Sequence, residues 1–308
     1  MPDPFRFLVD EAALRLSPST TPSELGETLE RLADLIEGLR AHRIGKFSMI
    51  WEEQLGPHAL YEWLFNPLLG IDVVVASALR VALDRTPNWD EACDTAGFPT
   101  QVTIGGIPHD AFSVGAAARA TCDRQATGCL SVLPSRHGRV YVIAGVWTPH
   151  LHFVAHPRDI FAFFREVPEV DNLDEEAYFQ NARLAFPGLL FVRARTDFGA
   201  FDEAYLTIRA KVTEHLGVLN DHARAILGGD EPAAVKEGRF GALGVEASGE
   251  NANTKANHAA MKQREVNVGD RAIVCDWHTK LRPHIDRIYF NATSYHQVVV
   301  GVFRDHLD

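Results

Sequence analysis

The alternation of apolar and polar positions along the chain predicts both helices and strands. The clearest helix signal starts at Thr21, where Pro22 fits the first helical position and Glu24 completes a capping box. Apolar residues then recur at helical spacing and bury one face of this helix: Leu25, Leu29, Leu32, Leu35, Ile36 and Leu39. The pattern therefore predicts an amphipathic helix that ends near residues 42–45.

The same periodicities place the remaining elements. Helices are predicted over residues 60–65, 73–83, 111–123, 159–166, 174–186 and about 202–227. Strands are predicted over residues 5–11, 47–51, 101–104, 129–133, 140–144, 150–154, 189–192, 265–280 (with a break at Gly269-Asp270), 287–292 and 297–303. The turn residues 134–138 predict a hairpin between two of these strands. The last strand is almost continuously apolar, which indicates a central position in its sheet.

A change of composition suggests where the chain divides. Residues 237–258 are rich in Gly, Ala, Ser and Asn and poor in large apolar side chains, which is typical of a loop. The sequence therefore predicts an α/β fold. In it, an acidic α/β body of mixed sheet and helices spans residues 1–232, and a polar linker spans 233–260. A small, mainly antiparallel sheet then spans 261–308.

Charge is distributed unevenly between these parts. The chain of 308 residues carries a formal net charge of -11, which argues against a general nucleic-acid binder. Residues 232–308 are nevertheless almost neutral, with ten Lys and Arg against nine Asp and Glu, and they hold five of the fourteen histidines. Either two modules have different roles, or the acidic surface has no meaning for partner choice; the sequence leaves both open.

The remaining composition points to a reducing compartment. The four cysteines, Cys93, Cys122, Cys129 and Cys275, match no metal-binding or redox spacing, so free thiols in the cytoplasm are expected. The start of the chain lacks the pattern of a secretory signal, and no apolar run is long enough to span a bilayer. We therefore expect a cytoplasmic protein without membrane contact.

The strongest candidate site lies in the last fifty or so residues. On a strand through residue 280, His278 and Lys280 share one face, and Arg282 lies just past its end. Arg287 begins the next strand. The last strand delivers two further groups near its end, Arg304 and His306.

Such a surface matches the chemistry of phosphodiester cleavage. Cations stabilise the charge that develops on phosphate, and histidine transfers protons near neutral pH. No cofactor is needed for this chemistry, and none is expected. The alternative is a solvated face of charge pairs, with Asp276 beside Lys280 and Asp286 beside Arg287.

The carboxyl-terminal segment also resembles a known family. Residues 286–290 (DRIYF) and 299–306 (VVGVFRDH) look like the terminal strands of RelE/ParE-type toxins, which are ribosome-dependent RNases or gyrase poisons. With residues 275–281 (CDWHTKL), they also resemble the closing segment of several bacterial proteins. The resemblance covers about 50 residues. It implies RNA or the ribosome as partner and a place in a bacterial defence or toxin-antitoxin-like system.

Two weaker candidates lie earlier in the chain. His150, His152 and His156 would share one face of a strand, a spacing that makes a metal site conceivable; the alternative is a wetter face opposite a packed one. The turn Gly105-Gly106 could hold an anion if a helix follows it, or Asp110 could simply cap that helix. The chain has no GxGxxG, Walker, GxSxG or HExxH pattern.

Two functional hypotheses follow. In the first, the protein is a metal-independent RNase or related nucleic-acid effector, in which His278, Lys280, Arg282 and Arg287 act on the phosphate and Arg304 or His306 assists. In the second, it is a non-catalytic sensor or scaffold subunit that binds a protein partner of a multi-component system through its carboxyl-terminal module.

Overall fold

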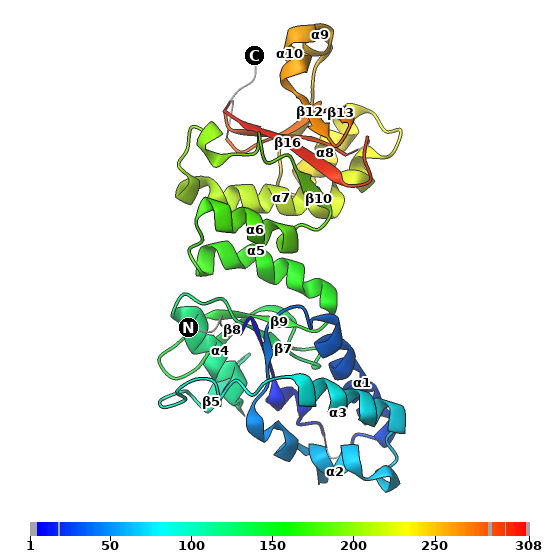
Figure 1. The fold of residues 1–308 in the computed structure, drawn as a ribbon, viewed down its shortest axis with the longest axis vertical. Helices are drawn as coiled ribbons and strands as arrows, with labels where there is room; N and C mark the ends of the chain where they lie inside the picture. Colours follow the sequence, from blue (N-terminus) through cyan, green and yellow to red (C-terminus); the bar gives the residue numbers. More distant parts are fainter. Residues whose placement is uncertain (1–4, 18, 283–284, 293, 306–308) are drawn as a thin grey trace. The chain divides into compact units, whose positions relative to one another are not determined.

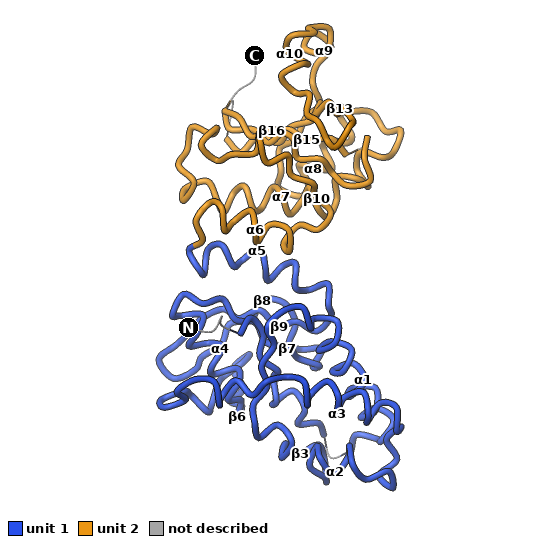
Figure 2. The backbone as a smooth tube through the Cα atoms, in the orientation of Figure 1, with its two compact units in different colours: residues 1–172 blue, residues 173–308 orange. Residues whose placement is uncertain are grey.

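Helices and strands are interspersed along the chain in this computed structural model, which describes residues 5–17, 19–282, 285–292 and 294–305 (Figure 1). The chain divides into two compact units, Met1–Asn172 and Leu173–Asp308 (Figure 2). Each unit contains a sheet covered by helices, so the predicted α/β class is confirmed. Among the described residues, no helix is long and apolar enough to cross a bilayer.

The sheet of the first unit is mixed, with strand order β2-β1-β7-β9-β8-β5-β6. Its strands are β1 (Phe7–Val9), β2 (Ile44–Gly45), β5 (Gln101–Ile104), β6 (Ile107–Asp110), β7 (Gly128–Leu130), β8 (Gly138–Ile143) and β9 (His150–Val154). The neighbours β2, β1, β7 and β9 run parallel, whereas β8, β5 and β6 pair antiparallel. A separate short hairpin pairs β3 (Gln54–Leu55) with β4 (His58–Ala59).

Helices cover both faces of this sheet. The helices of this unit are α1 (Pro22–Gly38), α2 (Leu60–Phe65), α3 (Val73–Arg85), α4 (Phe112–Cys122) and α5 (Ile160–Val170). Leu8 of β1 belongs to the buried cluster that includes the alanines of α4. The next side chain, Phe7, contacts Phe163 of α5 with 4.7 Å between ring centroids. Because successive strand residues point to opposite faces, α4 and α5 lie on opposite sides of the sheet.

The sheet of the second unit is mainly antiparallel, as predicted, with order β10-β16-β15-β14-β11. Its strands are β10 (Leu189–Phe191), β11 (Ala247–Gly249), β14 (Trp277–Lys280), β15 (Arg287–Asn291) and β16 (Val298–Arg304). Only β10 and β16 run parallel among these described pairs. The apolar strand β16 lies between two neighbours and is buried except at Arg304, which confirms its predicted central position.

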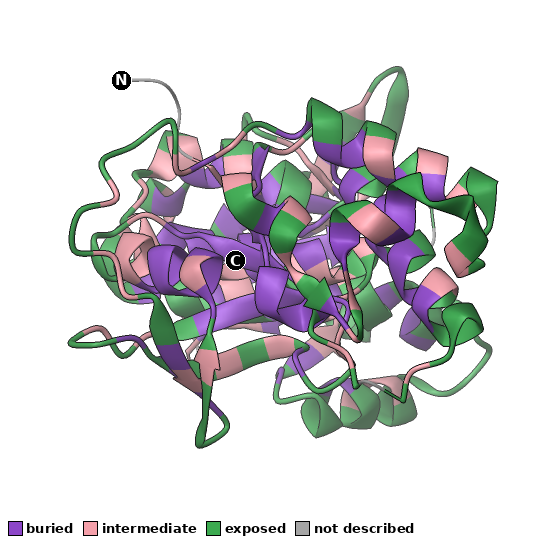
Figure 3. Ribbon diagram, turned by 90° about the horizontal axis from the view of Figure 1, so that it is seen from below, coloured by how far each residue is buried: buried purple, intermediate pink, exposed green. Residues whose placement is uncertain are grey.

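Different elements cover the two faces of the second sheet. The helices of this unit are α6 (Glu175–Ala185), α7 (Tyr205–Leu227), α8 (Ala233–Ala242), α9 (Ala252–Ala256) and α10 (His258–Gln263). On one face, Phe303 stacks on Phe201 at 4.9 Å, and Phe290 lies 6.1 Å from Phe240 of α8. The hairpin of β12 (Glu265–Val268) and β13 (Arg271–Val274) packs on the other face, against Tyr289 and Val302. Figure 3 shows that buried residues lie on strands and also on helices.

Several local predictions are confirmed. Thr21 caps α1: its hydroxyl accepts a hydrogen bond from the Glu24 amide at 3.3 Å, and the Glu24 carboxylate accepts one from the Thr21 amide at 2.9 Å. The predicted strand is interrupted at Gly269, as expected, and the φ of 58° at this residue is the left-handed conformation that glycine adopts readily. The predicted long helix is α7.

Other local predictions were wrong. Residues 48–52 form a short 3-10 helix instead of a strand, because the Ser48 amide and hydroxyl both bind the Asp90 carboxylate, and Ile44–Gly45 takes the position beside β1. The predicted hairpin between residues 129–133 and 140–144 does not form, since β9 lies between β7 and β8. The connection after β7 instead buries Arg136 against Asp10, at the end of β1.

The predicted linker region is structured. Residues 233–260 contain α8, β11, α9 and the start of α10, and the division between the units falls at residues 172 and 173. The asparagines that resemble loop residues have a specific role here. Asn251 accepts a hydrogen bond from the Thr254 amide and Asn257 one from the Ala260 amide, so each caps a short helix.

Candidate functional site

Three basic side chains lie side by side across the second sheet. Lys280 of β14 is the register partner of Arg287 of β15, and Arg287 is the partner of Arg304 of β16. Register partners share a face, so the three form one row, which we call the cationic row. The alternation of side chains along the strand predicted that Lys280 shares a face with His278. The structure shows that Arg287 of β15 and Arg304 of β16 lie on this same face.

His278 lies on the same face, one step along from the cationic row. It precedes Lys280 by two residues on β14 and pairs with Tyr289, whose ring centroid is 5.2 Å away. The imidazole is almost enclosed, at 5% exposure. The predicted convergence of His278 with Lys280 and Arg287 is therefore present, but the imidazole reaches solvent only through its neighbours.

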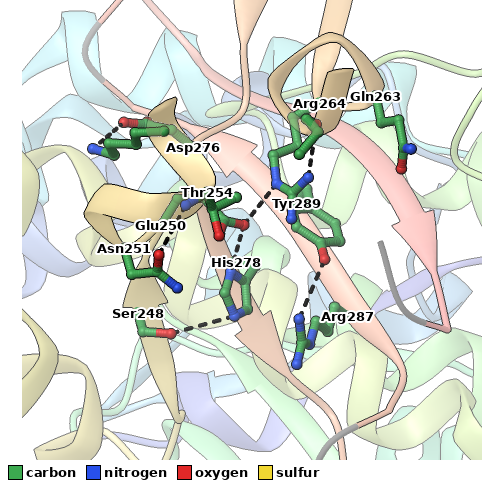
Figure 4. Close-up of polar contacts among 12 residues, drawn as sticks. Ser248, Glu250, Asn251, Thr254, Gln263, Arg264, Asp276, His278, Arg287 and Tyr289 are labelled. Atoms are coloured by element: carbon green, nitrogen blue, oxygen red, sulfur yellow. Dashed lines mark hydrogen bonds and ion pairs between the residues drawn. The ribbon is translucent and has the colours of Figure 1, made fainter. Parts of the chain in front are cut away.

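Two side chains flank this imidazole (Figure 4): one belongs to β11, and the other belongs to the residue that follows β11. Ser248 is the register partner of His278, and its Oγ lies 3.3 Å from Nε2. Glu250 lies on the other side, with Oε1 3.5 Å from Nδ1. Burial lowers the pKa of His278, Glu250 opposes this shift, and the charges of Arg287 and Lys280 reinforce it. The imidazole is consequently neutral at neutral pH.

The carboxylate beside the imidazole is held by a buried arginine. Arg264, only 2% exposed, donates from Nε to Oε1 of Glu250 at 2.7 Å and from Nη1 to the Ala260 carbonyl at 2.7 Å. Its guanidinium also lies over the ring of Tyr289, 5.3 Å from the centroid. Burial alone raises the pKa of Glu250, but the contacts of His278 and Arg264 outweigh it and lower that pKa to about 2. Glu250 is therefore an anion at any physiological pH.

The basic residues differ in how far acids already neutralise them. Lys280 pairs with Glu246 rather than with the predicted Asp276, because Asp276 lies outside β14 and pairs with Lys255. Arg282 is fully engaged, with Asp202 at 3.0 Å, Glu203 at 2.6 Å and Asp286 at 2.7 Å. Arg282 therefore serves the fold of the turn and is not available to a phosphate, contrary to its predicted role.

Arg287 and Arg304 differ from Arg282 because no acid among the described residues neutralises them. Within the described part of the chain neither has an acidic partner, and Arg287 also leaves its buried Nε without a hydrogen bond. The Nη1 atom of Arg287 lies 3.5 Å from the Tyr289 hydroxyl. Arg304 is exposed at the end of β16. The other predicted group at this end, His306, lies outside the described residues.

The predicted histidine cluster of the first unit does not come together. His150 is exposed and packs beside Tyr141, whereas His152 is 6% exposed and lies 3.5 Å from Oε1 of Glu166. The Nδ1 atom of His156 accepts a hydrogen bond from the Arg158 amide at 3.1 Å. Residues 5–17, 19–282, 285–292 and 294–305 contain no group of three or more His, Cys, Asp or Glu side chains placed to hold a metal ion.

The glycine turn is likewise not an anion site. Gly105 and Gly106 have φ of 59° and 82° and close the β5–β6 hairpin, so a strand and not a helix follows them. Asp110, expected to cap the helix, instead accepts a hydrogen bond from Gln101 at 3.1 Å. Helix α4 begins after Ala111.

Sequence reasoning missed Ser248, Glu250 and Arg264, although all three contact or support His278. Their segment was interpreted as a loop because of its glycines and asparagines. The available signal was the i, i+2 spacing of Ser248 and Glu250, which places two polar side chains on one face of an extended segment.

Comparison with protein-family models, with curated protein sequences and with solved structures gives no significant match. The resemblance to RelE/ParE-type toxins therefore stays a prediction.

Proposed function

We propose that the protein is a metal-independent, RNase-type nucleic-acid effector whose second unit binds and cleaves a phosphodiester. The observation that carries this proposal is the cationic row beside a buried histidine. Phosphodiesters present anionic oxygens, and preorganised cations are the groups that stabilise charge developing on them. The chain as a whole is acidic, so this local row is where a polyanion would be attracted.

Arg287 supports the proposal through an unmet hydrogen-bonding need. A buried donor without a partner costs on the order of 1–3 kcal/mol, and proteins rarely leave one without a reason. The Nε atom of Arg287 is such a donor among the described residues. A phosphate oxygen would satisfy it, and Arg304, its register partner, would supply a second guanidinium.

His278 would move the protons of the reaction. Its lowered pKa keeps it neutral, and a neutral imidazole can accept a proton near pH 7. Glu250, held as an anion by Arg264, would orient the ring and stabilise the imidazolium once it forms. The resemblance of the carboxyl-terminal segment adds RNA as the substrate and a bacterial defence or toxin-antitoxin-like setting to the proposal.

The test is cleavage of RNA by the purified full-length chain in the presence of EDTA. Arg287→Gln and Arg304→Gln should each lower the cleavage rate by about 10²-fold, the usual effect of removing one preorganised donor. Arg224→Gln is the matched control, because Arg224 is exposed on α7 and lies outside the site. This control should cleave at the wild-type rate.

The competing hypothesis makes the opposite prediction. A scaffold or sensor subunit would cleave no RNA, would be harmless when overexpressed and would co-purify with a partner protein. Equal cleavage by wild type, Arg287→Gln and Arg304→Gln would also remove the cationic row from the mechanism.

A further inference from the structure

Ser248, His278 and Glu250 stand in the order of a nucleophile, its base and the acid that orients the base (Figure 4). Each ring nitrogen faces the group that this chemistry requires, although Nδ1 makes no hydrogen bond of good geometry with the described residues in this state. Nε2 faces the serine Oγ at 3.3 Å, and Nδ1 faces the carboxylate at 3.5 Å. Both distances are somewhat longer than ideal hydrogen bonds, and such contacts commonly tighten when substrate binds.

The backbone fixes this order. Ser248 and His278 are register partners on β11 and β14, so their side chains emerge from the same face next to each other. The Glu250 amide donates to the Asp276 carbonyl at 2.9 Å, which continues the pairing beyond β11. Gly249 allows the close approach of the strands, because a Cβ there would lie 3.3 Å from the Trp277 ring. The serine, the imidazole and the carboxylate are thus placed by sheet pairing and not by a free loop.

Ser248 is also where the buried imidazole can reach a substrate. The serine is half-buried and lines a pocket of about 410 Å³ at the β11 edge of the sheet. The same pocket is lined by Lys280 of the cationic row and by two acids, Glu237 and Glu246. Lys280 pairs with Glu246 here, and an incoming phosphate would compete for that lysine.

We propose that Ser248 is a nucleophile that attacks the phosphorus of a phosphodiester and forms a transient phosphodiester between Ser248 and the retained nucleotide. This inference rests on the proposed function and names its nucleophile. In the first step the Oγ–P bond forms and the P–O bond to the leaving nucleoside breaks. The Oγ proton passes to Nε2 of His278 and then to the leaving oxygen.

The second step restores the enzyme. A water oxygen attacks the same phosphorus, its proton passes to Nε2, and the Oγ–P bond breaks. The proton then returns from Nε2 to Oγ, and the released product is a phosphate monoester. Because the nucleophile belongs to the protein, cleavage needs no ribose 2′-hydroxyl. RNA, 2′-O-methyl RNA and single-stranded DNA of one sequence should therefore be cleaved at rates within about tenfold of one another.

The experiment is covalent labelling of the full-length protein with a fluorophosphonate probe, which reports an activated serine without any nucleic acid. Peptide mapping of the wild-type protein should find the adduct on Ser248. Ser248→Ala should abolish the labelling, and His278→Gln and Glu250→Gln should slow it at least tenfold. Ser294→Ala is the control, since Ser294 is an exposed serine of the same unit, and it should label like the wild type.

The outcomes separate the two proposals. Cleavage of RNA but not of 2′-O-methyl RNA, with no adduct on Ser248, would overturn the nucleophile and leave the RNase proposal standing. An adduct on Ser248 without cleavage of any oligonucleotide would support the activated serine and overturn the proposed function. Peptide mapping of the wild-type protein decides between these outcomes even if Glu250→Gln fails to fold because Arg264 loses its carboxylate partner.

Discussion

Arg287 and Arg304 face each other across neighbouring strands, β15 and β16, although both are positively charged. Like charges directly opposite each other in a sheet are destabilising. Within the described residues no acid neutralises either one, whereas Arg282, a short distance along the chain, is neutralised by Asp202, Glu203 and Asp286. This contrast is the basis of our proposal that Arg287 and Arg304 serve a ligand and not the fold.

Removing one of these charges should therefore stabilise the protein. We expect Arg304→Gln to raise the free energy of unfolding by about 0.2–1 kcal/mol, measured by urea denaturation at low salt, and to weaken RNA binding. The gain should shrink at high salt. Arg224→Gln should change neither quantity. A loss of stability in Arg304→Gln would show that Arg304 makes a favourable contact in the folded protein.

The cleavage rate should depend on pH through His278. Burial lowers its pKa below the usual 6.5, so the imidazole is a competent base at and below neutrality. The rate should stay level from pH 8 to about pH 6.5 and fall only below that range, when the ring becomes protonated. Glu250→Gln removes the anion that favours the charged ring, so the acid limb should move to still lower pH. An unchanged acid limb in this variant would disconnect the two residues.

Glu11 should make the protein less stable as the pH rises. Burial raises the pKa of this carboxyl from 4.5 to about 7, with a further increase from Asp10 and opposition from Ser113. Between these two values the folded protein holds a proton that the unfolded chain has released, so stability falls as the pH rises through this window. The shift corresponds to roughly 3 kcal/mol.

Comparing Glu11→Gln with wild type at pH 5 and pH 8 isolates this contribution. The variant should lose less stability than wild type over the interval, as judged by denaturant midpoints. Glu30→Gln, at an exposed position of α1, is the matched control and should follow the wild type. Parallel pH curves for wild type and Glu11→Gln would contradict the buried, protonated carboxyl.

Gly301 should be intolerant of any side chain. A Cβ at this position of β16 would lie 2.4 Å from Sγ of Cys275 and 3.2 Å from the nearest methyl of Val266. We expect Gly301→Ala to destabilise the protein by about 1–3 kcal/mol through overpacking. Adding Cys275→Ala should recover part of the loss, which a double-mutant cycle measures. Gly26→Ala, on α1 with open space around it, should be neutral or stabilising.

The sequence predicted correctly those helices and strands that are determined by residues within the same element. The Thr21 capping box and the apolar run of β16 depend on residues within one element, so their patterns were sufficient. The place of β9 between β7 and β8 depends on pairings between distant or separately formed segments, such as Cys129 with Phe153. No periodicity of a single strand encodes such a pairing order.

The candidate site also has features that a local pattern predicts and features that depend on pairing between strands. Strand alternation was enough to place His278 and Lys280 on one face. The alignment of Lys280 with Arg287 and Arg304 depends on register, which the turn before β15 sets through Asp286, a residue with a φ of 56°. Ser248 and Glu250 were missed because glycine and asparagine are equally typical of loops and of the helix caps that they form here.

The short strand β11 has a consequence for control of the site. It contributes three residues to the border of the sheet and is paired through β14 alone among the described strands. Strand ends at a border open far more often than the interior does. Each such opening would carry Ser248 away from His278 while the remaining strands stay paired. Fraying of β11 would therefore lower the reactivity that we propose for Ser248, and renewed pairing would restore it. A ligand that clamps this border would then act as an activator without touching the reacting atoms.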